Sequence, residues 1–525
     1  MKPARRTDVP APTDLTAPNP ASQLSRGRRW AAVAVLSASL LVVMMDMTIL
    51  NLALPEMAAQ LQPSSTQQLW MVDVYSLVLA GLLVSWAAIG DRWGRKRMLL
   101  LGYSIFGLAS VLVLWASTAG HVIAIRAFLG IGGAMIMPTT LSLIRVMFTD
   151  PRERATALSI WAGVSGIGGA VGPLIGGFLL QHFSWHSAFL VNVPLMVVGV
   201  VAGIFILPES RVARPGPWDA VAAGLSLVGM IALVWAIKQF GKNASFGVPE
   251  AWAALLVAAA ALSWFAVRCL RSPYPLLDLR LFRSRPFSAG IIAAFGTMFA
   301  MMASFLLLAQ WLQLVDGATP LQAGVRLIPA ALASAVASLL APPLARLIGA
   351  RAVLAGGLAL AGGGLVFMGI RAVELTLPVA LVALTLVGMG AGALAIGSAM
   401  IMSGSPEERA GNAGALEETS YELGGTLGVA VLGSISALVY RSYFSGSGAA
   451  AGLDPAIAAQ AEESLGGAIA KAGELGLPEL AQGAAAAFNH SLQATGIAGG
   501  SLMIAVAVLV FFLTPRGTQV THTAH

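Results

Sequence analysis

The chain has 525 residues, of which 57% are hydrophobic and only 10% are charged. A soluble domain carries roughly 25% charged residues, so this composition excludes a soluble globular protein and indicates an integral membrane protein. The single cysteine, Cys269, excludes an intrachain disulfide. A formal net charge of +7 would suit a nucleic-acid-binding protein, but the basic residues are spread over short connections, so we expect no nucleic-acid partner.

Apolar stretches long enough to cross a bilayer recur along nearly the whole sequence. Roughly 20 residues of helix cross the hydrocarbon layer, and a helix satisfies its own backbone hydrogen bonds there. We therefore predict an all-α membrane protein with about fourteen spans. They are placed at 30–54, 68–89, 98–118, 120–143, 157–180, 186–207, 218–238, 250–270, 287–312, 321–343, 352–371, 377–402, 412–439 and 493–514.

The connections between these spans differ in charge. If the N-terminus lies in the cytoplasm, the inner connections hold most of the Lys and Arg residues and the outer ones only a few. Cytoplasmic loops carry this bias, so both termini are predicted to be cytoplasmic. The predicted units are a disordered tail 1–29, a six-helix bundle 30–207, two inserted helices 218–270, a second six-helix bundle 287–514 with an outer loop 441–491, and a tail 515–525.

Two similar stretches indicate an internal duplication. "GDRWGRKRMLLLGY" follows the second predicted span, and "LARLIGARAVLAGG" follows the tenth, with Arg346, Gly349 and Arg351 in similar places. Six helices, two inserted helices and six more helices would relate the copies as two halves about an axis along the membrane normal. Transporters are often built on this parallel-repeat plan.

The first of these stretches resembles the loop signature of the major facilitator superfamily, G-x-x-x-D-R-x-G-R-[KR]. Asp91, Arg92, Gly94 and Arg95 match it, and Ala87 stands where the first glycine is usual. The resemblance implies that Asp91 caps a neighbouring helix and pairs with Arg95, which would hold the two halves together in one state. Gly94 would permit the tight turn.

A second stretch, "GVSGIGGAVGPLIGG", resembles the antiporter motif G-x-x-x-G-P-x-x-G-G. The chain as a whole, from about 30 to 514, resembles the fourteen-helix drug:proton antiporter branch of that superfamily, in which the motif marks export. Glycines spaced by four lie on one helical face and let another helix approach closely, although generic small-residue packing would give the same pattern. The matching residues are Gly168, Gly172, Pro173, Gly176 and Gly177.

Two charged residues are predicted at similar depth in the membrane. Asp46 lies in "MMDMTILNLALP", which resembles the signature of the fourteen-helix branch, and Arg126 lies in "IRAFLGIGGA", which resembles the superfamily's intramembrane arginine motif. At about 1.5 Å per helical residue, their depths agree. Because either charge alone would be uncompensated, we expect the two to pair. Such a pair could be structural, or it could be functional, with Asp46 among the acids that couple protons to the substrate cation.

Three carboxylates interrupt the apolar stretch "GALEETSYELGG". By resemblance to the drug antiporters, Glu417 and Glu422 are the acids that couple protons to substrate. Glu418 shares a helical face with Glu422, however, so the residues alone leave open whether Glu417 or Glu418 faces the cavity. Asp73, in "WMVDVYSL", also matches a family acid, but near the end of its span it could equally be a solvated interfacial residue.

The energy source follows from what the sequence lacks. It has no phosphate-binding loop, no H-E-x-x-H motif and no Cys/His cluster, so we expect no ATP hydrolysis, no enzymatic activity, no metal site and no cofactor. An ion gradient remains. Burial favours a protonated carboxyl group, and once deprotonated the same group can bind a cation, so a proton and a lipophilic cation would compete for one site.

The resemblance therefore implies a proton-coupled antiporter that exports lipophilic cationic drugs, biocides or dyes across the inner (cytoplasmic) membrane. Its partners would be protons, these cations and the lipid bilayer, and we expect a multi-pass monomer. A dedicated exporter of one metabolite or antibiotic is the alternative. A transporter-shaped receptor or lipid-modifying enzyme is a third possibility, against which the antiporter motif argues.

Overall fold

In a computed structural model of the protein, residues 24–148, 150–211, 218–243, 247–273, 275–405, 410–450 and 453–516 are described. These residues are helical almost throughout, and no strand occurs among them. Twelve of the described helices are long and apolar enough to cross a membrane, and a bent helix, α2, raises the number to thirteen. The predicted all-α membrane fold is confirmed, whereas fourteen spans and cytoplasmic termini stay predictions.

The N-terminal bundle is built from helices that pair in a fixed pattern. α1 packs against α5, α4 against α2 and α3, and α7 against α3. α1 begins within the predicted disordered tail 1–29, whose residues 1–23 lie outside the described part. The elements are α1 (Arg26–Leu61), α2 (Ser65–Trp93), α3 (Arg95–Leu112), a 3-10 turn (Val113–Trp115), α4 (Ala119–Met147), α5 (Pro151–His182), α6 (Ser187–Leu190) and α7 (Asn192–Ile206).

The two inserted helices, α8 (Ala220–Asn243) and α9 (Pro249–Arg271), pack against each other. At their ends, Arg268 Nε donates to a carboxylate oxygen of Asp219 at 2.5 Å. This hydrogen bond lowers the pKa of Asp219 from its usual range. α8 also packs against α2 and against α15 of the second bundle, so the inserted pair contacts both halves of the protein.

The C-terminal bundle ends in a helical hairpin where an outer loop, 441–491, was predicted. Helices take up much of this stretch, because α15 continues to Gly446 and α18 already begins at Pro478. Asp454 and Ser464 cap two short helices between them. The elements are a 3-10 turn (Leu279–Arg283), α10 (Arg285–Leu314), α11 (Pro320–Ile348), α12 (Ala350–Arg371), a 3-10 turn (Ala372–Glu374), α13 (Leu377–Ala391), α14 (Leu394–Ser403), α15 (Ala410–Gly446), α16 (Pro455–Glu463), α17 (Leu465–Leu475) and α18 (Pro478–Leu513).

The predicted duplication is visible in α2 and α11, which are built alike. Each begins with a capping box, formed by Ser64 with Gln67 and by Thr319 with Gln322. Each spans 29 residues and ends at a glycine with positive φ, +120° at Gly94 and +89° at Gly349. L-residues with side chains rarely adopt such φ values, which explains the glycine in both copies.

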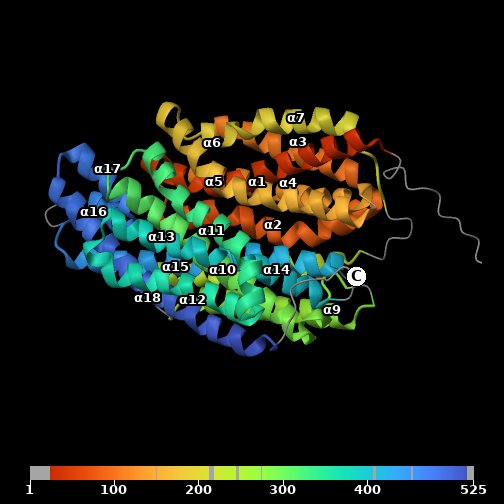
Figure 1. The fold of residues 1–525 in the computed structure, drawn as a ribbon. Coiled ribbons are helices and arrows are strands. Elements are labelled where there is room, and N and C mark those ends of the chain that lie inside the picture. Colours follow the sequence, from red (N-terminus) through yellow and green to blue (C-terminus); the bar gives the residue numbers. More distant parts are fainter. Residues whose placement is uncertain are drawn as a thin grey trace, which may run out of the picture.

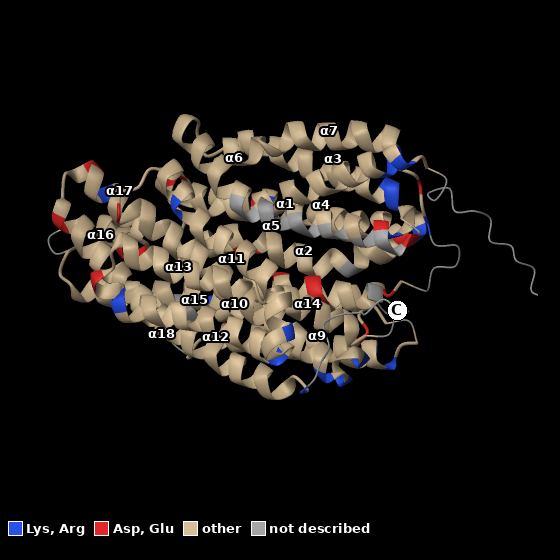
Figure 2. Ribbon diagram, viewed as in Figure 1, with Lys and Arg blue, Asp and Glu red and all other residues tan. Residues whose placement is uncertain are grey.

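The bundle has two distinct ends (Figure 1). α1 begins and α18 ends at one of them, where Figure 2 shows most of the Lys and Arg residues; we call it the basic end. α16 and α17 lie at the opposite end, which we call the hairpin end. This separation of charge is the one that the loop composition predicts.

The two halves touch toward the hairpin end. Gln313 Nε2 of α10 donates to the carbonyl oxygen of Leu52 in α1 at 3.3 Å. α5 and α11 approach so closely that a Cβ atom added at Gly324 would lie 2.2 Å from the carbonyl oxygen of Pro173. The hydroxyl of Ser65, the first residue of α2, donates to the carbonyl oxygen of Glu463 in the hairpin. α1, α2 and α5 therefore meet the second half at or near this end.

Candidate functional site

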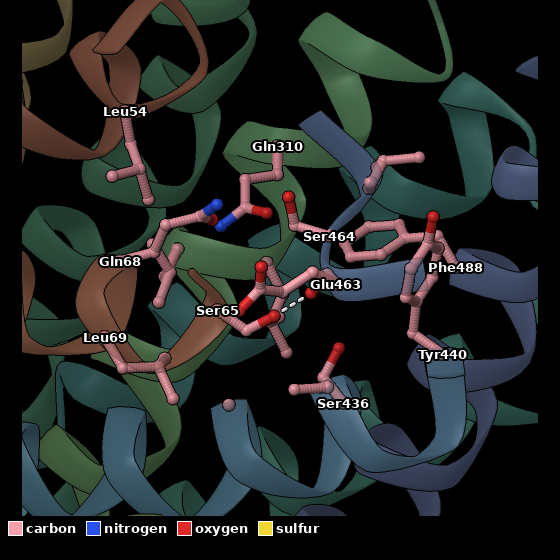
Figure 3. Close-up of a pocket in the computed structure, with 15 residues that line it drawn as sticks. Leu54, Ser65, Gln68, Leu69, Gln310, Ser436, Tyr440, Glu463, Ser464 and Phe488 are labelled. Carbon is pink, nitrogen blue, oxygen red and sulfur yellow. Dashed lines mark hydrogen bonds between the residues drawn. The ribbon is translucent and has the colours of Figure 1, made fainter. Parts of the chain in front are cut away.

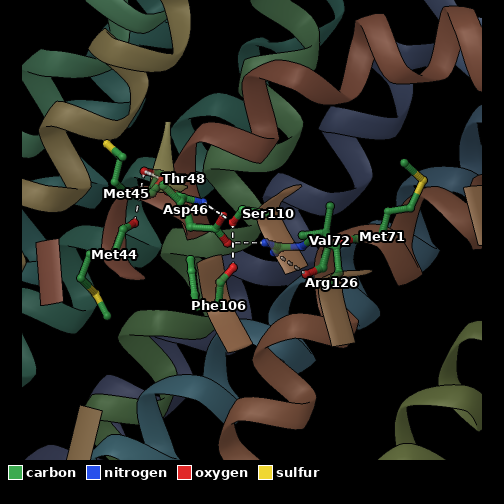
Figure 4. Close-up of polar contacts among 10 residues, drawn as sticks. Met44, Met45, Asp46, Thr48, Met71, Val72, Phe106, Ser110 and Arg126 are labelled. Atoms are coloured by element: carbon green, nitrogen blue, oxygen red, sulfur yellow. Dashed lines mark hydrogen bonds and ion pairs between the residues drawn. The ribbon is translucent and has the colours of Figure 1, made fainter. Parts of the chain in front are cut away.

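An ion pair joins α1 to α4 deep inside the N-terminal bundle, as the sequence predicts (Figure 4). Arg126 Nη1 donates to Asp46 Oδ2 at 2.5 Å, and the two side chains are 2% and 1% exposed. Asn192, the first residue of α7, donates from Nδ2 to the other carboxylate oxygen at 2.9 Å. Arg126 Nε donates to the carbonyl oxygen of Met71 at 3.1 Å, and its guanidinium carbon lies 4.4 Å from the centre of the Tyr75 ring. Both charges are therefore compensated.

Asp73 of α2 forms a second buried ion pair, which the sequence does not predict. Lys238 Nζ of α8 lies 3.1 Å from Asp73 Oδ2, and both side chains are fully enclosed. The Trp70 ring covers the ammonium group at 4.1 Å. The interpretation of Asp73 as a solvated interfacial residue is thus wrong. Lys238 lies inside α8, which continues to Asn243.

The three acids of α15 lie in different surroundings. Glu417 is 7% exposed, and its Oε1 accepts a hydrogen bond of 2.7 Å from Tyr421 Oη. Glu422 is 3% exposed, and the side chain of Ser76 in α2 lies within hydrogen-bonding range of its carboxyl group. Glu418 is half-buried, and the carboxyl groups of Glu422 and Glu417 act on it electrostatically. Glu422 therefore faces the N-terminal half.

A small cavity, which we call the central cavity, lies between the two halves at the depth of Asp73 and Arg126. Asn51 Oδ1 and Thr426 Oγ1 of its lining, and Oε2 of Glu422 beside the lining residue Ser76, have no hydrogen-bond partner among the described residues. Buried polar atoms are normally paired, so a group of unpaired ones marks a place where water, a proton or a ligand can be accommodated. The lining residues are Met47 and Asn51 of α1, Val72, Asp73 and Ser76 of α2, Arg126 of α4, Met302 of α10, and Gly425, Thr426 and Val429 of α15.

A second cavity lies nearer the hairpin end (Figure 3). Its polar side chains include Gln68 of α2, Gln310 of α10 and Ser436 of α15, and Glu463 of the hairpin closes one side. Tyr440 Oη fixes the hairpin by donating to the carbonyl oxygen of Ala461 at 2.9 Å. This second cavity also has walls from both halves, but apart from Glu463 its lining carries no charged side chain.

Comparison with protein families agrees with this architecture. Residues 36–429 match the model of the Major Facilitator Superfamily, which is well over half of the chain. The chain belongs to the major facilitator superfamily. Its relatives include the multidrug efflux pump LfrA of Mycolicibacterium smegmatis, which is 38% identical over 94% of this chain and 97% of its own length.

Two more relatives and two solved structures are similar over nearly their whole lengths. The methyl viologen resistance protein SmvA of Salmonella typhimurium is 35% identical, covering 92% of this chain and 98% of its own. The tetracenomycin C resistance and export protein of Streptomyces glaucescens is 31% identical, with coverages of 94% and 93%. A bacterial homologue of the lysosomal transporter Spinster has a TM-score of 0.64 at 17% identity, with coverages of 93% and 98%. A peptide transporter of the POT family has a TM-score of 0.61 at 16% identity, with coverages of 92% and 95%.

The superfamily loop motif anchors the segment that follows α7. Asp91 lies inside α2 and accepts from Arg95 Nη2 at 2.8 Å, as predicted, whereas its capping of a neighbouring helix stays a prediction. Arg95 Nη1 donates to Ser210 Oγ at 3.2 Å, and the backbone N–H of Lys96 donates to Glu209 Oε1 at 3.2 Å. These contacts lie within the N-terminal bundle, and the predicted link between the halves stays a prediction.

The glycines of the antiporter motif let α5 contact two neighbouring helices. Gly168, Gly172 and Gly176 face α1, where an added Cβ atom at Gly172 would lie 2.1 Å from Thr48 Oγ1. Gly177 faces α11 of the other half, with the carbonyl oxygen of Pro320 2.6 Å from an added Cβ. The predicted close helix approach is therefore present, and the motif also reaches the contact between the halves.

Sequence reasoning missed Lys238, Asn192 and Ser76 as members of this site. A hydropathy window treats a lysine as the end of a span, and no pattern in the sequence joins α8 to α2. Asn192 and Ser76 lie in apolar stretches without a motif. The described residues contain no group of three or more His, Cys, Asp or Glu side chains placed to hold a metal ion.

We predict that Gly172→Leu abolishes transport, because the new side chain would meet Thr48 Oγ1 and the carbonyl oxygen of Met45, 3.1 Å from an added Cβ. Overpacking of this kind costs about 1–3 kcal/mol and displaces helices. Substrate efflux at matched membrane expression measures the effect. Gly363→Leu is the control, since nothing lies within 4 Å of an added Cβ there. Wild-type efflux by the Gly172 variant would contradict the packing described.

For the Asp46–Arg126 pair we predict strong coupling in a double-mutant cycle. Asp46→Asn leaves a buried guanidinium without a counterion and should cost about 3–5 kcal/mol of stability. Arg126→Gln should cost less, because Asp46 can become neutral by taking up a proton. The double variant should regain most of the lost stability. Thermal melts of the four proteins measure this, and strictly additive losses would show that the pair does not interact energetically.

Proposed function

We propose that this protein exports lipophilic cations in exchange for protons, by alternating exposure of the central cavity to the two sides of the cytoplasmic membrane. The basic end would face the cytoplasm and the hairpin end the outside. We further propose that it acts as a monomeric carrier and not as an enzyme. The similarity to LfrA and SmvA, whose names describe multidrug efflux and methyl viologen resistance, supports the class of substrate.

One observation carries the proposal: Glu422 is buried beside the central cavity, and no described residue forms an ion pair with it. Asp46 and Asp73 each have a basic partner within 3.1 Å, so each of these pairs is neutral overall. Glu422 Oε2 has no hydrogen-bond partner among the described residues, although Arg126 acts on it electrostatically from a distance. A carboxylate in such a place needs either a proton or an external cation. This is the requirement for exchange at one site.

The proposed cycle uses this competition. When the cavity is open to the outside, Glu422 takes up a proton, which removes its charge. When the cavity is open to the cytoplasm, the proton leaves and a lipophilic cation replaces it. Thioether side chains of Met47 and Met302 line the cavity and suit an apolar, polarisable ligand. The drive is about 2.3 kcal/mol per charge for each 100 mV and about 1.4 kcal/mol per pH unit.

Glu418 extends this scheme toward the cytoplasm. It lies one turn before Glu422 and so closer to the start of α15, and its side chain is partly exposed. We propose that it passes protons between Glu422 and the basic end. Glu417, which points toward Tyr421, would instead stabilise the helix packing.

We predict that Glu422→Gln abolishes proton release on cation binding and active efflux. Charge-assisted contacts contribute about 1.5–3 kcal/mol, so affinity for tetraphenylphosphonium should fall roughly tenfold or more. The measurement is proton release from purified protein in weakly buffered detergent, followed by efflux from proteoliposomes. Glu479→Gln, at an exposed acid of α18, is the matched control. If the Glu422 variant still drives efflux against a gradient, Glu422 is not the exchange site.

We also predict unequal effects for the two neighbouring acids. Glu418→Gln should slow proton-driven efflux while leaving thermal stability close to wild type, because Glu418 is partly exposed. Glu417→Gln should mainly lower the melting temperature, because it disturbs the buried contact with Tyr421. Melts and initial efflux rates separate the two outcomes. Equal losses of efflux at equal stability would remove the distinction between these acids.

An exporter dedicated to one metabolite is the second candidate, favoured by the similarity to the tetracenomycin C resistance and export protein. The same scaffold could serve either purpose. A panel of lipophilic monocations, dications and neutral polyketides, tested for binding to the purified protein, separates the candidates. Several structurally unrelated cations bound with similar affinity would support broad export, and one bound compound would support the dedicated exporter.

A further inference from the structure

Asp73 lines the same central cavity as Arg126 and Thr426, yet it is already occupied by a basic group of the protein itself. The ammonium of Lys238 lies 3.1 Å from Asp73 Oδ2, and the two side chains are 0% and 1% exposed. Apart from this ion pair, neither charged group has a hydrogen-bond partner among the described residues. The pair is therefore held by charge and burial alone.

The position of Lys238 is fixed by apolar packing. Met230 and Val234 of α8 contact Leu77 of α2 and Ala430 of α15 in one buried cluster. A Cβ atom added at Gly81 of α2 would lie 2.7 Å from the side chain of Leu227 in α8, so the two helices are also close at this point. The Trp70 ring lies 4.1 Å from the ammonium. These contacts hold α8 against both halves and present its lysine to the cavity acid.

The acids near the central cavity differ in whether they have a basic partner. Lys238 and Arg126 are the cations that act on Asp73, and Arg126 is itself paired with Asp46. Glu422 lies beside Ser76, three residues after Asp73 in α2. Among the described residues, Asp46 and Asp73 thus have basic partners, and Glu422 has none. If Lys238 were absent, two acids without basic partners would lie at this place, Asp73 in the cavity lining and Glu422 beside it.

We propose that Lys238 is a tethered counterion that withholds Asp73 from exchange and so limits the carboxyl groups at which a proton can be traded for a cation. This inference rests on the proposed proton–cation exchange. It makes Lys238 a specificity-determining residue: with Asp73 neutralised, the cavity offers its free charge at Glu422 and suits a monovalent cation. Freeing Asp73 would add a second exchangeable proton and favour a dication.

The test compares wild type with Lys238→Met and with the double variant Asp73→Asn, Lys238→Met. Proton release is counted on adding tetraphenylphosphonium, a monocation, and methyl viologen, a dication, to purified protein in weakly buffered detergent. Lys238→Met should release about one proton more per bound methyl viologen than wild type, because a freed buried carboxyl group is protonated until a cation binds. With tetraphenylphosphonium the count should not change. The affinity of Lys238→Met for methyl viologen, divided by its affinity for tetraphenylphosphonium, should be severalfold higher than in wild type.

The double variant keeps the inference testable even if Lys238→Met does not fold, because it leaves no buried charge unpaired. It should release as many protons as wild type with both cations. A lower count than wild type would show that Asp73 exchanges in the native protein and would overturn the inference. An unchanged proton count in folded Lys238→Met would also overturn the inference, and the Asp73–Lys238 ion pair would then be only structural. No proton release by wild type with either cation would instead contradict the proposed function.

Discussion

The arrangement of this site depends on one constraint: a charge inside a membrane protein must be compensated where it lies. In a low-dielectric interior an unpaired ion is costly, so each buried charge needs an opposite charge, a proton or a ligand. Asp46 meets this requirement through Arg126 and Asn192, and Asp73 meets it through Lys238. Glu422 does not meet it within the described protein, and that difference is the reason to propose Glu422 as the exchanging acid.

The same constraint explains why distant segments are held together. Arg126 is oriented by backbone carbonyl oxygens of α2 as well as by Asp46, so it ties α1, α2 and α4 at one depth. Lys238 ties the inserted helix α8 to α2 in the same way. The inserted helices therefore do more than lengthen the chain. One of them supplies a charge that balances an acid of the central cavity.

Much of the fold could be predicted from the sequence, because apolar length and loop charge specify membrane helices and the loop motif specifies the repeat. The Asp46–Arg126 contact was also predictable, since both residues lie in recognisable motifs and at similar predicted depths in the membrane. The role of Lys238 was not predictable, because it depends on Asp73, a partner more than 160 positions away in the sequence. The sequence indicates the helices of the hairpin only weakly, for a related reason. Its Ala- and Gly-rich helices are stabilised by packing against the bundle, and hydropathy records only the apolar parts.

The contact between α5 and α11 has a mechanical consequence. Gly177 meets the backbone of Pro320, and Gly324 meets the backbone of Pro173, so this seam between the halves is formed by main-chain atoms. Main-chain surfaces have no rotamers to rearrange and no long side chains to disentangle. In the proposed alternating access, the halves would part and close again along this seam without slow repacking of side chains. The glycines would thus lower the energy barrier to movement of the two halves in the proposed alternating access.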